Sequence, residues 1–134
     1  MAAPQVEVDI ASYLTTTVGL SNVSISLLAP TPLNQYAVVE YAGPMGVKTH
    51  GTSNPNANVL DESHIQIMAR HTSVATARTN IYTVYDSLDG LKDVTINSKV
   101  YTWITALSRP RLLTREESGA VLFIAEFFVQ SRRP

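Results

Sequence analysis

The sequence predicts an α+β domain in which a mainly antiparallel β-sheet is flanked by two helices. One observation is the clear helical repeat of residues 73–88, and a second is the set of short segments rich in β-branched and aromatic residues. The third is the order of elements: a helix, three strands, a helix and three more strands, which favours α+β over a regular strand–helix alternation. The length of 134 residues suits a single domain spanning 1–134.

The first helix is predicted over residues 4–17. Val6, Ile10, Leu14 and Val18 recur every four positions and form one apolar stripe, and Gly19 is typical of a helix C-terminus. The run Thr15-Thr16-Thr17 weakens the helix, because β-branched side chains lose rotamer freedom there. Two strands are predicted next, over 24–28 and 36–41, with prolines ending the first.

The segment from 43 to about 62 has no periodicity and is rich in Gly, Pro and Asn. Loops of this length are uncommon in compact domains and are usually functional, so we interpret it as a partner-contacting loop; a plain solvated loop is the alternative. The candidate contact residues are Met45, Val47, Lys48, His50, Asn54 and Asn56.

A strand over 64–70 follows, with Ile65, Ile67 and Ala69 on one face, and then the second helix. Ser73 is its predicted cap and Asp89-Gly90 its end. Its apolar stripe is Val74, Ala77, Ile81, Val84 and Leu88.

The face of this second helix opposite its apolar stripe is predicted to carry neutral, small side chains, with Asp86 as its one charge: Thr76, Thr79, Asn80, Thr83 and Ser87. Because such groups are cheaper to desolvate than Lys or Glu, we expect this surface to pack against a neighbouring subunit. The predicted interface residues are Thr76, Asn80, Thr83 and Ser87.

The C-terminal part is predicted to hold three strands. Segments 94–96 and 100–105, joined by Asn97-Ser98-Lys99, form a tight hairpin. Residues 115–119 form a charged turn, and 120–130 form a long strand. Because this strand is apolar on both faces, we expect it to be central and covered on both sides.

The search for chemistry finds no catalytic, cofactor or metal site. There is no cysteine, and His64 and His71 lie roughly 20 Å apart along one strand. No Gly-x-Ser-x-Gly elbow or glycine-rich phosphate loop is present. We therefore expect no enzyme; a small enzyme using Glu116 or His64 is the remote alternative.

The amino-acid composition limits the classes of partner that the protein can bind. The formal net charge of −1 gives no general attraction to nucleic acid, and no apolar run approaches the ~18 residues of a membrane span. Only 16% of the residues are charged, which is low for a soluble monomer and hints that partners cover part of the surface.

A family resemblance rests on the order and spacing of motifs between 64 and 129. The motifs are Tyr85-Asp86-Ser87-Leu88-Asp89-Gly90, Val94-Thr95-Ile96-Asn97, Tyr101, Ala106-Leu107-Ser108-Arg109-Pro110, Leu113, Arg115-Glu116-Glu117-Ser118-Gly119 and the strand through Phe127 and Val129. This pattern resembles the minor capsid proteins of tailed bacteriophages that act as tail terminators in long-tailed phages. Ser98 and Lys99 depart from it where a glycine-containing turn is expected, and Leu112-Leu113-Thr114 lacks a glycine often found there.

The resemblance implies a small sheet flanked by helices and a six-membered ring of identical subunits on the end of the tail tube. Such a ring stops tube polymerisation and docks head-completion or stopper proteins, and DNA passes through its lumen only in transit. The implied partners are therefore a second copy, the tail tube protein and a head-completion protein, with no cofactor and no membrane. The implied location is the tail end of the virion neck, after synthesis in the host bacterial cytoplasm. Another neck protein is the nearest alternative.

Overall fold

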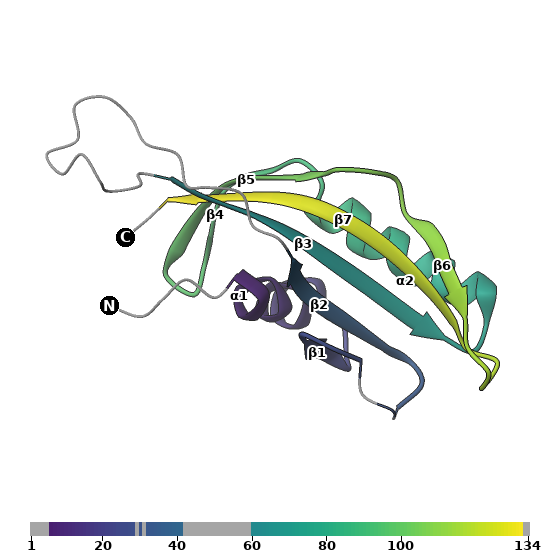
Figure 1. Cartoon of the computed structure of the whole chain (residues 1–134). Coiled ribbons are helices and arrows are strands. Elements are labelled where there is room, and N and C mark those ends of the chain that lie inside the picture. Colours follow the sequence, from purple (N-terminus) through teal and green to yellow (C-terminus); the bar gives the residue numbers. More distant parts are fainter. Residues whose placement is uncertain (1–5, 29, 31, 42–59, 133–134) are drawn as a thin grey trace, which may run out of the picture.

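The computed structural model describes residues 6–28, 30, 32–41 and 60–132, and it confirms an α+β fold (Figure 1). The predicted contact residues between Met45 and Asn56 lie outside the described part of the chain. The elements, in chain order, are α1 Val6–Tyr13, the π-helical segment η1 Leu14–Val18, β1 Val23–Ile25, β2 Gln35–Tyr41, β3 Leu60–His71, α2 Val74–Leu88, β4 Leu91–Ile96, β5 Lys99–Ala106, β6 Arg111–Arg115 and β7 Val121–Arg132.

Strand β7 is the centre of a seven-stranded sheet, as its two apolar faces predicted. One edge pairs with β3 over its whole length, from Val121 opposite His71 to Arg132 opposite Leu60. The other edge is divided: β5 pairs with its C-terminal half and β6 with its N-terminal half. Only β1 and β2 run parallel, so the sheet is mainly antiparallel.

Both helices pack on the same face of this sheet, where the hydrophobic core lies (Figure 1). The core takes the predicted Ile65, Ile67 and Ala69 of β3 and every second residue of β7. On the helix-free face, Leu122 and Ile124 are also buried, with 7% and 1% of their surface exposed, whereas Phe128 is only half-buried. Both faces of β7 are therefore covered near its N-terminal end, as expected, whereas the helix-free face is only partly covered near its C-terminal end.

Helix α2 follows its prediction closely. Oγ of Ser73 accepts a hydrogen bond from the Thr76 N–H at 3.3 Å, which satisfies one of the free amides at the start of the helix. Ala77, Ile81, Val84 and Leu88 are fully buried. The Asp89 carboxylate accepts a 2.8 Å hydrogen bond from the Ala106 N–H, which fixes the end of the helix to β5.

The predicted N-terminal helix is present but loosens into a π-helical turn, η1, where the threonines begin. The Thr15 and Thr16 hydroxyls donate to the carbonyls of Ala11 and Ser12, at 2.9 and 2.7 Å. Such back-bonding competes with the regular backbone ladder. Gly19 ends the segment with φ of 86°, and its N–H donates to the Leu14 carbonyl.

Two sequence expectations are corrected. The first strand ends at Ile25 rather than 28, because Ser26 adopts φ of 75° and leaves the extended conformation. Residues 111–115, for which no strand was predicted, form β6; the predicted turn is confirmed but shorter, since Arg115 still pairs with Val121. Pro110 directly before the strand and the absence of polar–apolar alternation hid it.

The β4–β5 hairpin turns through two residues with positive φ, Asn97 at 51° and Ser98 at 66°. Ile96 pairs with Lys99 across them, so the loop is two residues long and has the φ signs of a type I′ turn. Asn tolerates this conformation and glycine is preferred after it, so Ser98 holds the turn at a steric cost.

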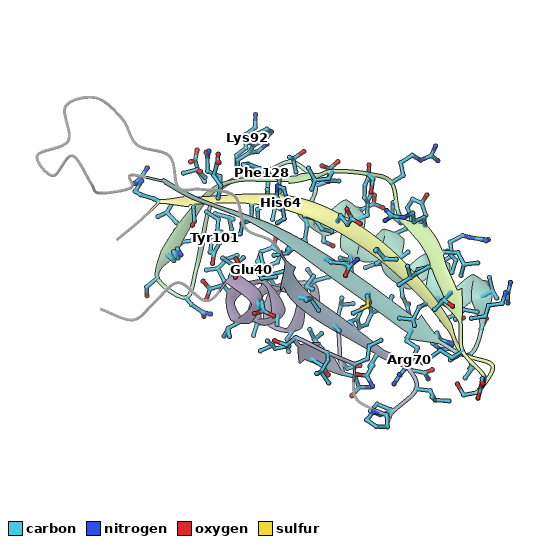
Figure 2. All side chains as sticks on the ribbon, viewed as in Figure 1. Glu40, His64, Arg70, Lys92, Tyr101 and Phe128 are labelled. Carbon is cyan, nitrogen blue, oxygen red and sulfur yellow. The ribbon has the colours of Figure 1, made fainter. Side chains whose placement is uncertain are left out.

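A buried polar network joins the first helix to this hairpin. Asp9 is only 8% exposed and accepts hydrogen bonds from the Tyr101 hydroxyl and, at 2.9 Å, from Nδ2 of Asn97. Burial, then the hydrogen bond to Asp9 and the negative charges of Asp9 and Glu40, raise the pKa of Tyr101 above its usual 10.0. Tyr101 and Glu40 are labelled beside α1 in Figure 2.

A second buried group, Arg70, fixes the connection between β1 and β2 (Figure 2). Its guanidinium donates to the backbone carbonyls of Pro32 and Leu33, each at 2.9 Å. Its Nε lies 3.7 Å from Oε1 of Glu116 in the β6–β7 turn. One side chain therefore ties together two loops that are far apart in the sequence.

Replacing Tyr101 by Phe removes a hydroxyl that serves a buried carboxylate. We expect Tyr101→Phe to lower the free energy of unfolding by about 1–3 kcal/mol at pH 7, measured by urea denaturation. An unchanged midpoint would contradict the structural role of this network.

The same variant carries a pH signature. Because the pKa of Tyr101 is raised in the folded state, the unfolded chain alone ionises at this position near pH 10, and wild-type stability falls as the pH rises above that value. The variant lacks this loss, so the difference in free energy of unfolding between the wild type and Tyr101→Phe should narrow between about pH 10 and 11. A gap that stays constant there would argue against it.

Ser98→Gly should stabilise the hairpin by up to about 1 kcal/mol, because glycine adopts positive φ without a Cβ clash. The Ser98 side chain is exposed, so little packing is lost. Ala at the same position, which has a Cβ but no hydroxyl, is the matched control. Thermal unfolding measures the change, and a lower midpoint for Gly than for Ala would refute the explanation.

Candidate assembly surfaces

The four predicted interface residues lie on one continuous stripe of α2. Thr76 and Thr83 are exposed, whereas Asn80 and Ser87 are half-buried. Each stands one position before a buried residue of the core stripe, and one residue turns a helix by about 100°. The stripe therefore flanks the buried face, whereas the sequence led us to expect it on the opposite face.

Two hydroxyl groups of this stripe, those of Thr83 and Ser87, and that of the neighbouring Thr79 are already satisfied within the helix. Thr79, Thr83 and Ser87 donate to the carbonyls of Ala75, Thr79 and Thr83, at 3.0, 3.0 and 2.6 Å. Covering these side chains would leave none of their donors unpaired, which keeps the cost of desolvation low. The geometry therefore suits contact with another surface.

The helix-free face carries a row of aromatic rings across three neighbouring strands. The His64 ring of β3 lies 6.0 Å from the Phe128 ring of β7, and the Trp103 ring of β5 lies 5.6 Å from it on the other side, both edge to face. Trp103 remains 41% exposed, whereas Tyr101 is buried. His64, Phe128 and Lys92 are labelled together in Figure 2.

Further apolar side chains are exposed on both sides of β7, along the sheet margins. Beside β1, Ile25 and Leu27 are 43% and 68% exposed. On β6, Leu112 and Leu113 are 43% and 49% exposed. Sequence reasoning missed the second pair as a surface because it did not assign residues 111–115 to a strand; two adjacent leucines between arginines were the available signal.

The two residues considered for catalysis are kept apart. Glu116 lies beside Arg70, six residues along β3 from His64, which corresponds to roughly 20 Å. His71 accepts a hydrogen bond from the Ser73 N–H through Nδ1 at 2.9 Å. Within the described ranges, no three His, Cys, Asp or Glu residues gather closely enough to hold a metal ion.

Among the described residues, no helix is long and apolar enough to cross a membrane.

Comparison with known proteins is informative only at the level of structure. No family model matches the chain, and no curated protein matches its sequence. A chain from the solved structure "Virion of native gene transfer agent (GTA) particle" is similar, with a TM-score of 0.56 and 16% sequence identity. The similarity covers 96% of this chain and 95% of that chain, so the two proteins share a fold over nearly their whole lengths.

Proposed function

We propose that this protein is a structural component of a tailed-phage virion. In this proposal it is the tail terminator: a ring of identical subunits, six by the family resemblance, caps the tail tube, stops its polymerisation and joins it to the head-completion proteins.

The observation that carries the proposal is the shared fold with a chain of a virion particle. The similarity covers 96% of this chain and 95% of that chain. The motif order between Tyr85 and Val129 supports the finer assignment independently of it.

The described surface agrees with an assembly role. The sheet margins expose pairs of large aliphatic side chains, and three α2 hydroxyls on or beside the stripe already donate within the helix. Soluble monomers rarely expose such residues in groups, and contiguous apolar patches commonly mark sites of protein contact. A ring subunit needs surfaces for its neighbours as well as for the tube and the head.

Removing the gene tests the terminator role. Without the protein, we expect tail tubes of uncontrolled length and heads without tails in negative-stain micrographs, both reversed by expressing the wild-type chain. A head-completion or stopper protein, the nearest alternative, should instead leave tail length unchanged. Normal particles in the deletion strain would contradict both roles.

The remote enzyme alternative makes a different prediction. It requires an activity that disappears in His64→Ala or Glu116→Gln without loss of folded protein. The roughly 20 Å between the two positions means that they cannot serve one reaction centre together.

The α2 stripe is the proposed contact between neighbouring subunits. Asn80→Lys combined with Thr83→Lys should lower incorporation into particles at least about tenfold, because burying unpaired charge costs more than the 1.4 kcal/mol that a tenfold change requires. Lysine is a good helix former, so the isolated protein should keep its thermal midpoint.

Thr17→Lys combined with Thr95→Lys is the charge-matched control, since both positions are exposed and lie outside α2. It should enter particles at the wild-type level. Equal incorporation of the two double variants would show that the α2 stripe is not part of the interface between subunits.

A further inference from the structure

We propose that neighbouring copies of this chain join margin to margin, the β6 margin of one subunit packing against the β1 margin of the next. The inference rests on the ring in the proposed function and adds a pair of contact surfaces to the α2 stripe. The β6 margin is defined by Leu112 and Leu113 with the flanking Arg109 and Arg115, and the β1 margin by Ile25 and Leu27 with Glu7.

Each margin offers a free strand edge, as does β4, which pairs only with β5 in the described sheet. β1 pairs only with β2, and β6 pairs only with β7, within the described chain. They lie on opposite sides of β7, and Figure 1 draws them well apart. Free edges with apolar side chains invite pairing with another chain.

The apolar content of these margins is concentrated. Seven large hydrophobic side chains of the described residues are exposed, and four of them are Ile25, Leu27, Leu112 and Leu113. The pairing register of β6 skips from Leu112 opposite Phe123 to Thr114 opposite Leu122, so Leu113 sits in a bulge without an opposite residue. Bulges re-aim side chains, and this one leaves Leu113 half exposed at the margin.

The charges of the margins are complementary. The exposed Arg109 and Arg115 make no ion pair within the described residues. Beside β1, the Glu7 carboxylate accepts a 2.9 Å hydrogen bond from the hydroxyl of Ser26, the residue that separates Ile25 from Leu27 in the sequence. A basic margin with two leucines therefore matches an acidic margin with two aliphatic residues.

The presence of two different margins also indicates which molecule binds to them. A self-complementary patch joins two copies into a closed dimer, whereas two different complementary surfaces on one subunit generate head-to-tail assembly. This chain has two different surfaces on opposite margins, so a second copy of the chain is the partner that satisfies both at once.

The absence of cysteine from the sequence allows a direct test. Leu27→Cys and Leu113→Cys in one chain cannot bridge within a subunit, because four strand spacings, about 19 Å, separate the margins and a disulfide spans less than ~7 Å between Cα atoms. Particles carrying this chain are oxidised, and their proteins are separated without reductant. We expect a ladder of covalent oligomers up to the full ring.

Three comparisons sharpen the result. Particles that mix the two single variants should give cross-linked dimers, and each single variant alone should stay monomeric. Leu27→Cys with Trp103→Cys, whose second site is similarly exposed but lies on the helix-free face, is the matched control and should give no ladder. Leu112→Ser with Leu113→Ser should reduce incorporation at least about tenfold.

The outcomes separate this inference from the proposed function. Rings in particles without a ladder from the 27/113 pair, or dimers from a single variant, would overturn the margin-to-margin contact and leave the terminator role standing. Absence of the chain from particles, read by mass spectrometry, would overturn both.

Discussion

The pairing of β3 with β7 is the constraint on which the rest of the structure depends. The two strands keep one register over twelve residues without interruption. This register places Ile65, Ile67 and Ala69 beside the core residues of β7, and both helices cover the face so formed. A shift of β3 by one residue would turn Ile65, Ile67 and Ala69 away from the core, so the register and the core specify each other.

Around this pair, two polar groups fix the periphery. Asp9 ties α1 to the β4–β5 hairpin through Tyr101 and Asn97, and Arg70 ties the β1–β2 connection to the turn before β7. Both groups are buried and hydrogen-bonded, so they specify one arrangement of loops rather than adding apolar stabilisation. In the described part of the molecule, polar contacts therefore fix the loops to the sheet, and exposed apolar side chains lie at the β1 and β6 margins.

The sequence predicted the elements whose signals are local. The Ser73 cap and the spacing from Ala77 to Leu88 defined α2, and the two apolar faces of 120–130 placed that strand at the centre. It did not predict β6, because Pro110 and the adjacent Leu112 and Leu113 interrupt the strand pattern. Nor could it predict the Asp9–Tyr101 contact: an acidic residue in the first turn of a helix is ordinarily solvated, and its partner is 92 residues away. For the candidate surfaces, composition indicated the neutral stripe of α2, whereas the exposed margins required the strand assignments.

The central place of β7 has a consequence for biosynthesis. It follows every other described element in the chain, yet β3, β5 and β6 all pair with it. While a ribosome still holds this segment, those strands have no common partner, and the emerging polypeptide exposes several open edges at once. Collapse of the sheet therefore waits until residues 121–132 have been released, and a nascent chain stalled earlier would be a substrate for chaperones rather than a partly finished domain.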